Sequence, residues 1–182
     1  MIRTIDFLAA LIGLTLLWPI LLVVTILGQF DTGSPIFVQT RVGKGKKPFK
    51  LIKFRTMSVE TKSVASHLAA NSSITKLGSI LRKTKIDELP QLINVLKGEM
   101  SLVGPRPNLF NQEELIKERE AKGIYDVLPG ITGLAQVENI DMSTPKLLAE
   151  TDKKMIEMLT LRDYFKYILM TVTGSGSGDA VK

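Results

Sequence analysis

The longest apolar stretch of the chain covers residues 7–27 and contains no charged side chain. At about 1.5 Å of rise per residue, a helix of this length just crosses the ~30 Å hydrocarbon core of a bilayer. Pro19 lies in the middle of the stretch, where it removes a backbone hydrogen bond and kinks a helix. The pattern therefore predicts a membrane helix that either spans the bilayer or enters and leaves on one face. A cleaved signal peptide is disfavoured, because no small-residue cleavage site follows before "GQFDTGSP".

Two alternating segments follow, "PIFVQTRVG" and "PFKLIKFRTM", with "GKGKK" between them. Alternation of apolar and polar residues on both sides of a glycine-containing turn predicts a β-hairpin within residues 34–57. From Arg41 to Arg55 the hairpin is rich in Lys and Arg and has no acidic residue. Because positive residues prefer the cytoplasmic side of a membrane, we place the body that follows in the cytoplasm.

The basic side chains of the hairpin have two interpretations. They can form a solvated face held against anionic membrane lipids. They can instead contact the phosphates of a substrate. The sequence pattern favours the solvated face for most of these residues, which are Arg41, Lys44, Lys46, Lys47, Lys50, Lys53 and Arg55.

The rest of the chain predicts helices separated by irregular segments. Leu89, Leu92 and Leu96 have helical spacing and predict a core-facing helix that Gly98 closes. The other predicted helices cover 74–84, 109–123 and 146–173. The pattern further predicts a loop or weak helix over 58–73, a strand and rigid turn in "SLVGPRP", a loop in "VLPGITGLAQV" and a flexible tail over 174–182. The apolar end of the last helix, "YFKYILMTV", either lies at the membrane interface or closes the core.

Composition narrows the possible chemistry. The chain has 182 residues, 45% hydrophobic and 23% charged, which suits one domain or one domain with an anchor. Its net charge of +6 favours anionic partners such as phosphates, nucleic acid or anionic lipids. There is no Cys and a single His, His67, which argues against a thiolate site, a histidine-cluster metal site and a Ser-His-Asp triad. We therefore expect acid–base and nucleophilic chemistry from carboxylates.

Two adjacent carboxylates, Asp87 and Glu88 in "KIDELPQ", precede an apolar helix. In one interpretation Asp87 is the N-cap, Pro90 is tolerated in the first turn, and Glu88 favours the positive end of the helix. In the other interpretation the pair performs the chemistry. Side chains of successive helical residues point about 100° apart, so the two carboxylates would then have separate roles.

Nearby arginines strengthen the chemical interpretation. Arg82 precedes the pair, and Arg106 lies between Pro105 and Pro107. Guanidinium groups hold phosphates bidentately, Mg²⁺ prefers oxygen ligands, and an Asp carboxylate can be the nucleophile in phosphoryl transfer. No G-x-x-x-x-G-K-[ST] or G-x-G-x-x-G motif is present, so a conventional nucleotide fold has no support.

The motifs "PIFVQTRVG", "FKLIKFRTM", "LRKTKIDELPQLINVLKGEMSLVGPRP" and "PGITGLAQ" together resemble the bacterial sugar transferases, also called monotopic phosphoglycosyl transferases. The resemblance runs to about residue 171 and is to the minimal catalytic form of that family. It implies a small membrane-associated α+β domain with a re-entrant helix kinked at Pro19, a short β-hairpin and several amphipathic helices. The implied units are a re-entrant membrane helix over 1–30, a cytoplasmic catalytic domain over 31–173 and a flexible tail over 174–182.

The resemblance also implies a reaction. Members of the family transfer a phosphosugar from a UDP-sugar to a polyprenyl (undecaprenyl) phosphate at the cytoplasmic face of the bacterial inner membrane, and UMP leaves. Asp87 matches the nucleophile that forms a phosphosugar–enzyme intermediate with Mg²⁺ beside it, and Glu88 matches the residue that assists the metal or the acceptor. The remaining matches are Arg82 and Arg106 for phosphate binding, and Pro105 and Pro107 for the nucleotide-binding turn.

The expected partners are therefore a UDP-sugar, a polyprenyl phosphate and anionic membrane lipids, without nucleic acid; a homodimer is left open. The sequence departs from the family pattern at three places: Trp18 precedes Pro19 where Ser is frequent, "DKKM", which begins at Asp152, lacks the aromatic residues expected after that Asp, and "VENIDMS" follows "GLAQ". The last two regions are expected near the sugar, so no particular sugar is assigned. Two other functions remain open, a membrane-anchored basic adaptor without catalysis and a membrane phosphohydrolase that uses Asp87 and water.

Overall fold

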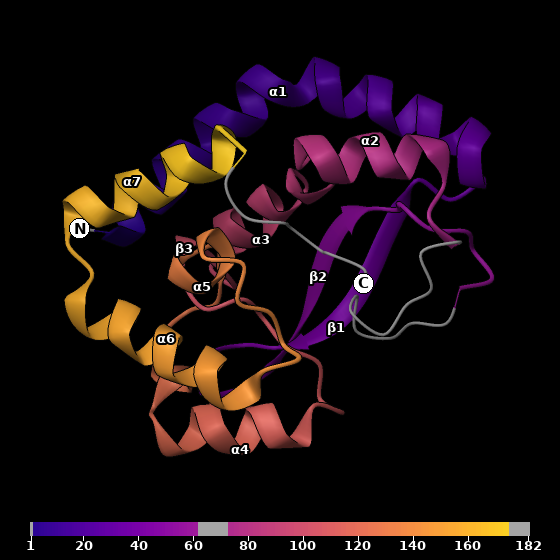
Figure 1. Cartoon of the computed structure of the whole chain (residues 1–182). Helices are drawn as coiled ribbons and strands as arrows, with labels where there is room; N and C mark the ends of the chain where they lie inside the picture. Colours follow the sequence, from indigo (N-terminus) through magenta and orange to yellow (C-terminus); the bar gives the residue numbers. More distant parts are fainter. Residues whose placement is uncertain (1, 62–72, 175–182) are drawn as a thin grey trace.

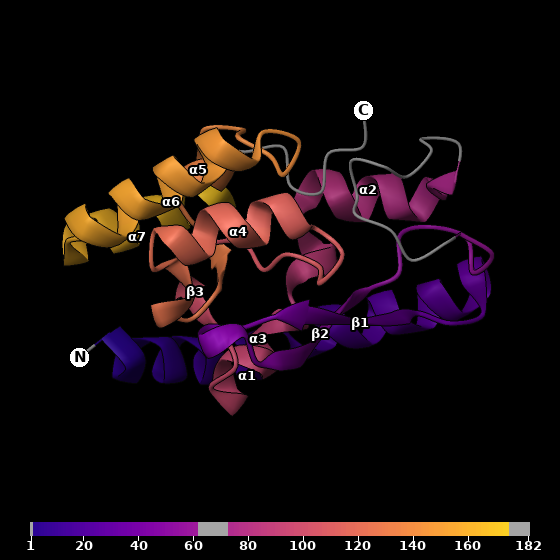
Figure 2. The same ribbon diagram turned by 90° about the horizontal axis from the view of Figure 1, so that it is seen from below.

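The structure is a computed structural model that describes residues 2–61 and 73–174. It is a mixed α and β fold, as the sequence predicts. Figure 2 shows α1, α3 and the hairpin on one side of the molecule, and α4 to α7 on the other. The helices and strands are α1 (Ile2–Thr32), β1 (Ile36–Val42), β2 (Pro48–Phe54), α2 (Lys76–Thr84), α3 (Gln91–Lys97), β3 (Ser101–Val103), α4 (Glu113–Ala121), β4 (Gly130–Thr132), α5 (Leu134–Val137), α6 (Pro145–Met158) and α7 (Leu161–Val172). His67 and most of the predicted tail lie outside the described residues.

The apolar stretch forms one long helix, α1, which continues through Pro19 and arches over the upper side of the molecule (Figure 1). Within the described part of the chain, α1 is the one helix long and apolar enough to cross a membrane by length and composition. Near its start, Asp6 is buried and accepts hydrogen bonds from the Leu102 amide at 2.8 Å and the Tyr164 hydroxyl at 2.6 Å. Near its end, Val24 is buried in a cluster with Phe54. Both ends of α1 therefore contact the same globular body.

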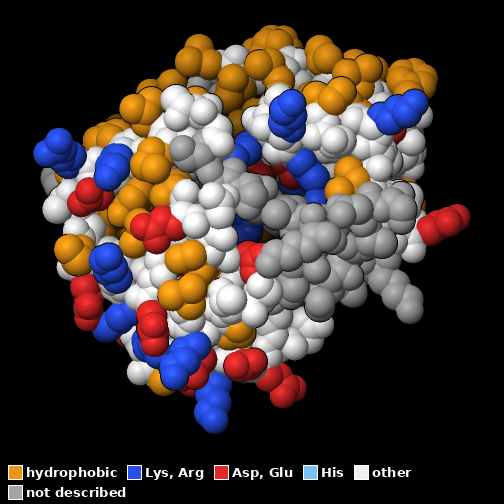
Figure 3. Space-filling model, in the orientation of Figure 1, with side chains coloured by type: hydrophobic (Ala, Val, Ile, Leu, Met, Phe, Trp, Pro, Cys, Tyr) orange, Lys and Arg blue, Asp and Glu red, His pale blue; other side chains and the backbone are white. Residues whose placement is uncertain are grey.

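The outer side of α1 exposes large apolar side chains. A single exposed apolar residue is ordinary on a protein surface, but a continuous strip of them marks a membrane or partner surface. Figure 3 shows this strip along the edge that α1 forms. The exposed residues of α1 are Phe7, Leu8, Leu11, Ile12, Leu16, Trp18, Ile20, Leu22, Val23, Ile26, Leu27 and Phe30.

The predicted hairpin is confirmed. Strands β1 and β2 pair antiparallel, with Ile36 opposite Phe54 and Val42 opposite Pro48, and a short turn over Lys44–Lys46 joins them. One face of the hairpin carries Phe49 and Leu51, whose buried side chains pack with residues of α3 and α1. This face of the hairpin is therefore packed against both α1 and α3.

A second sheet pairs β3 with β4 in parallel, Ser101 opposite Gly130. The strands approach closely, since a Cβ on Gly130 would lie 2.0 Å from the backbone nitrogen of Gly104. The prediction of a plain loop in "VLPGITGLAQV" was wrong here, because this segment contains β4 and α5. The Pro and Gly residues of this segment indicate a loop, and the partner of β4 lies far away in the sequence.

The C-terminal helix α7 has a side that packs in the core, as one interpretation of its apolar end predicted, and an exposed side with apolar residues. Tyr164 is fully buried and closes the core, while Leu169 and Val172 are 64% and 79% exposed. The exposed side of α7 is thus apolar, like the outer side of α1.

Candidate active site

Asp87 and Glu88 lie in a short 3₁₀ turn (Ile86–Glu88) between α2 and α3. Both carboxylates are almost fully buried, at 2% and 5% exposure. The interpretation in which Asp87 is the N-cap of the helix was wrong, because α3 begins only at Gln91 and Pro90 occupies the cap position. The left-handed backbone of Lys85, with φ of 57°, ends α2 and starts the 3₁₀ turn that separates the carboxylates from α3.

Glu88 forms an ion pair with Arg106, whose Nη2 lies 2.7 Å from Glu88 Oε1. The charges of Arg106, Glu88 and Asp87 also act on the pKa of the neighbouring Lys85. Burial lowers the pKa of the Lys85 ammonium below its usual value; Arg106 acts in the same direction, and Glu88 and Asp87 oppose it. The structure therefore gathers two carboxylates and two cations around one turn of the chain. Figure 3 shows charged side chains deep in the middle of this face, below the apolar edge of α1.

The turn that carries Arg106 is fixed through its backbone carbonyls. The carbonyl of Pro105 accepts from the Gly130 amide at 2.9 Å, and that of Pro107 accepts from Arg41 Nη1 at 3.2 Å. The Arg106 carbonyl accepts from Arg119 Nη1 at 2.8 Å. The prolines restrict φ, so these bonds leave the Arg106 side chain as the adjustable part of the turn.

Behind this turn lies a buried ion pair. Arg119 Nη2 donates to Asp152 Oδ2 at 2.7 Å, and both side chains are almost completely buried. Burial raises the pKa of the Asp152 carboxyl, and the charge of Arg119 opposes this shift. The sequence placed Asp152 near the sugar. In the structure its carboxylate is enclosed and supports Arg119, which in turn holds the backbone of Arg106.

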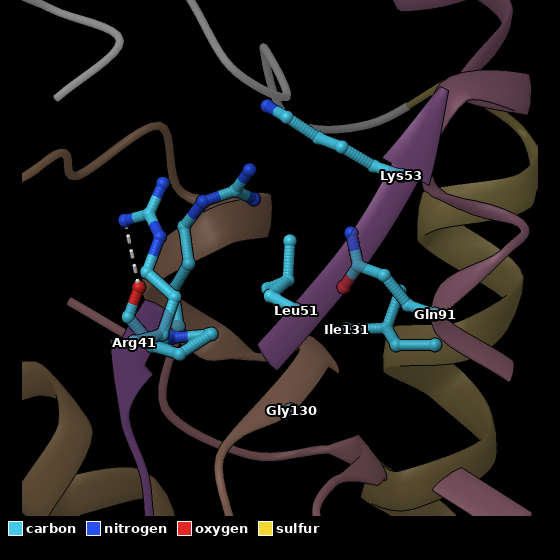
Figure 4. A pocket seen from close by; sticks show the side chains of 8 residues that line it. Arg41, Leu51, Lys53, Gln91, Gly130 and Ile131 are labelled. Atoms are coloured by element: carbon cyan, nitrogen blue, oxygen red, sulfur yellow. Dashed lines mark hydrogen bonds between the residues drawn. The ribbon is translucent and has the colours of Figure 1, made fainter. Parts of the chain in front are cut away.

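Two basic residues of the hairpin belong to this site and not to the solvated face that the sequence favoured. Arg41 and Lys53 are only 6% and 7% exposed. With Arg106 and Gln91 they line a small polar cavity, hereafter the basic cavity. Figure 4 shows Arg41 on one side of it and Lys53 and Gln91 on the other. Lys44, Lys46, Lys47 and Lys50 are exposed, as predicted.

The signal for Arg41 and Lys53 was present in the hairpin itself. In an antiparallel pair, alternate residues of each strand share one face. The register places Arg41 opposite Phe49, and Lys53 lies two residues beyond Leu51. Both cations therefore share the face of Phe49 and Leu51, which is the face turned to the core.

Arg82 lies in the last turn of α2 and is hydrogen-bonded to Thr56, which follows strand β2 by two residues. Its Nε donates to the Thr56 hydroxyl at 2.8 Å. Helix α2 can approach this closely because residue 78 is Gly; a Cβ there would lie 2.1 Å from the Thr56 carbonyl oxygen. Of the two predicted phosphate-binding arginines, Arg106 contacts Glu88 directly, and Arg82 donates to Thr56.

A second cavity, of about 380 Å³ and mainly apolar, reaches the turn that carries the carboxylates. Lys85 and Glu88 line it, together with residues of α1, α3 and α7. We call it the apolar cavity. Glu88 lines the apolar cavity and its partner Arg106 lines the basic cavity, so the ion pair lies between the two.

The carboxylate oxygens of Asp87 and Glu88 suit Mg²⁺ only if a substrate supplies further ligands. Among the described residues, no group of three or more Asp, Glu, His or Cys side chains could hold a metal ion. Mg²⁺ is usually bound by one or two carboxylates together with substrate phosphates and water. The adjacent buried carboxylates Asp87 and Glu88 fit that mode, and a complete protein cage is not required.

Comparison with known proteins identifies the family. A sequence model described as bacterial sugar transferase matches residues 1–176. The chain therefore belongs to the bacterial sugar transferases, and with the apolar helix α1 it is a membrane-associated transferase.

Three relatives illustrate the family. The chain is 46% identical over 136 residues to the uncharacterized sugar transferase EpsL of Bacillus subtilis, covering 74% of this chain and 67% of that protein. It is 37% identical over 182 residues to the UDP-glucose:undecaprenyl-phosphate glucose-1-phosphate transferase of Caulobacter vibrioides, covering 93% and 67%. It is 35% identical over 187 residues to the UDP-N-acetylgalactosamine-undecaprenyl-phosphate N-acetylgalactosaminephosphotransferase of Aeromonas hydrophila, covering 96% and 44%. The chain thus spans about two thirds of the first two relatives and less than half of the third.

Proposed function

We propose that this protein transfers a phosphosugar from a UDP-sugar to undecaprenyl phosphate and releases UMP, as a first membrane step in building a glycoconjugate such as O-antigen, capsule, exopolysaccharide or a glycoprotein glycan. The observation that carries the proposal is the buried Asp87–Glu88 pair, with Glu88 bonded to Arg106 between a basic and an apolar cavity. The cations Arg41, Lys53 and Arg106 suit the charge of a diphosphate, and the apolar cavity suits a lipid. The names of the Caulobacter and Aeromonas relatives describe the same reaction type with two different sugars.

In the first half-reaction the donor diphosphate lies against Arg41, Lys53 and Arg106. An Asp87 carboxylate oxygen attacks the phosphorus next to the sugar, and the bond from that phosphorus to the oxygen shared with UMP breaks. UMP leaves with its negative charge stabilised by the guanidinium and ammonium groups. Asp87 then carries the sugar phosphate as an acyl phosphate.

In the second half-reaction an oxygen of the acceptor phosphate attacks the phosphorus held by Asp87. The bond between that phosphorus and the Asp87 oxygen breaks, and the free carboxylate is restored. Glu88 accepts the proton that the acceptor phosphate carries. Asp87, with Glu88 beside it, would hold Mg²⁺, which when bound supplies charge neutralisation for the diphosphate.

The arrangement of α1 supports a re-entrant position with the body on the cytoplasmic face. A helix that crosses the ~30 Å hydrocarbon core carries its two ends to opposite sides of the membrane. Here both ends of α1 contact one body, through Asp6 and through Val24. The cluster of basic residues after α1 favours the cytoplasmic side for that body.

A panel of UDP-sugars with undecaprenyl phosphate and Mg²⁺ tests the proposal by release of UMP. We expect release with at least one UDP-sugar, dependence on the acceptor for continued turnover, and loss of turnover in Asp87→Asn. Release of free sugar phosphate without acceptor would support a phosphohydrolase instead. If no UDP-sugar yields UMP while charge reversal at Lys44, Lys46 and Lys47 abolishes binding to anionic vesicles, the protein is an adaptor.

A further inference from the structure

The apolar cavity is bounded by two helices that meet near one end and leave a space between them further along. Near their N-terminal ends, α1 and α7 are joined by the hydrogen bond from Tyr164 to Asp6. Further along, Leu17 and Ile20 of α1 and Ile168 of α7 line the cavity. Its volume of about 380 Å³ lies in the usual range of small-molecule sites, roughly 300–1,000 Å³.

The outer part of the cavity is continuous with the apolar surface of the molecule. Ile20, which lines it, is 42% exposed and lies next to Pro19 in the arch of α1. Val172, which lines it from α7, is 79% exposed. A molecule dissolved in the membrane that covers α1 can therefore enter this cavity without crossing a polar surface.

The other part of the cavity is charged and belongs to the catalytic turn. Lys85 and Glu88 line it, and Glu88 is the partner of Arg106. An apolar passage that ends at an ammonium group fits a ligand with an apolar chain and an anionic head. A free anion would gain nothing from the apolar walls, and an uncharged lipid would gain nothing from Lys85.

We propose that the apolar cavity binds the acceptor lipid, with the isoprene units nearest the phosphate between α1 and α7 and with Lys85 contacting the acceptor phosphate beside Glu88. This inference rests on the proposed function and adds to it a site and a set of residues. Donor and acceptor then approach Asp87 from two separate cavities, and the Glu88–Arg106 pair lies where they meet.

Helix α7 forms one wall of the proposed acceptor site. The hydroxyls of Thr132 in β4 and Thr171 in α7 are hydrogen-bonded to one another, and both residues line the cavity. This bond fixes the C-terminal part of α7 to the strand next to the catalytic turn. The position of α7 therefore sets the width of the passage that the lipid occupies.

Two tryptophan substitutions on α7 separate this role from a general effect on the helix. Ile168→Trp places a large ring in the cavity, while Leu169→Trp places the same ring on the outer surface, where Leu169 is 64% exposed and does not line the cavity. The measurements are the acceptor KM, and the burst of UMP that the enzyme releases with UDP-sugar alone. We expect Ile168→Trp to raise the acceptor KM at least about tenfold with an unchanged burst. Leu169→Trp is expected to match the wild type in both.

The outcomes distinguish the two proposals. If the wild type shows no acceptor-dependent UMP release, the proposed function itself fails. If the wild type turns over and Ile168→Trp has the wild-type acceptor KM, the acceptor-site inference alone is overturned. If Ile168→Trp loses the burst of UMP with UDP-sugar alone, this variant no longer tests acceptor binding by itself. The acceptor KM is then measured in Val172→Trp, which also alters the lining of the cavity but at an exposed position. A raised acceptor KM in Val172→Trp supports the inference, and an unchanged one overturns it.

Discussion

Arg106 donates a hydrogen bond to Glu88 at 2.7 Å, and this contact joins two cavities of opposite character. Arg106 lines the basic cavity, where Arg41 and Lys53 are also buried, and Glu88 lines the apolar cavity. A transferase that moves a charged group from a water-soluble donor to a lipid needs both environments at one reacting centre. The ion pair lies at the boundary between them, and Asp87, the residue before Glu88, is buried and lines neither cavity.

The first prediction concerns the donor. Lys53→Met should raise the donor KM by roughly tenfold or more, because hydrogen bonds to charged groups are worth about 1.5–3 kcal/mol. Lys50 lies on the same strand but on the other face, and it is exposed. Lys50→Met removes the same charge from the same strand and should leave the donor KM unchanged. Equal effects of the two substitutions would show that the hairpin acts only through its overall charge.

The second prediction concerns the buried pair of Arg119 and Asp152. Removing one partner leaves an unpaired buried charge, so Asp152→Ala should lower the free energy of unfolding by about 3–5 kcal/mol, measured by urea denaturation in detergent. The double variant Arg119→Met with Asp152→Leu should recover most of that stability, since apolar replacements of a buried pair are often neutral.

Activity should separate from stability in the same double variant. It loses the donor that Arg119 supplies to the Arg106 carbonyl, so we expect turnover to stay reduced and the donor KM to stay raised. Full recovery of turnover together with stability would contradict a positioning role for Arg119.

Part of the fold could be predicted from residues that end helices or form turns. Gly98 ends α3 in a left-handed conformation, with φ of 82°, as expected for a helix C-cap. The alternating segments gave the hairpin, and its register follows from the turn. Local sequence carries these features because local backbone sterics and side-chain alternation cause them.

The site was only partly predictable, for physical reasons. The left-handed Lys85 that detaches Asp87 from α3 is a non-glycine residue at positive φ, which no local preference indicates. The contact of Arg106 with Glu88 depends on the pairing of β3 with β4, and thus on Gly104 and Gly130 approaching across a long stretch of chain. The residue types at the site could be read from the sequence, but their grouping into two cavities could not.

The third prediction concerns pH. Burial lowers the pKa of the Lys85 ammonium below the ordinary 10.5, against the opposing charge of Glu88 and with that of Arg106. Lys85 therefore loses its proton, and its attraction for the acceptor phosphate, at a lower pH than an exposed lysine. The acceptor KM of the wild type should rise as the pH approaches this lowered pKa. In Lys85→Arg, which stays charged, that rise should be absent; identical profiles would exclude Lys85 from acceptor binding.

The fourth prediction concerns the membrane. The chain has no Cys, so single cysteines can be introduced without background. Thr4→Cys and Asp31→Cys, near the two ends of α1, should both react with a charged maleimide added from the cytoplasmic side and neither from the periplasmic side. Leu16→Cys, within the lipid-facing strip, should react from neither side. Labelling of Thr4→Cys from the periplasm would mean that α1 spans the bilayer.

The most direct test of the account is the mass of the intact protein after incubation with UDP-sugar and Mg²⁺ in the absence of acceptor. The wild type should gain the mass of one sugar phosphate while an equal amount of UMP appears, and addition of undecaprenyl phosphate should remove the adduct. Asp87→Asn should gain no mass, and peptide mapping should place the wild-type adduct on Asp87. Acceptor-dependent turnover in the wild type without any adduct, or an equal adduct on Asp87→Asn, would contradict the assignment of Asp87 as the nucleophile.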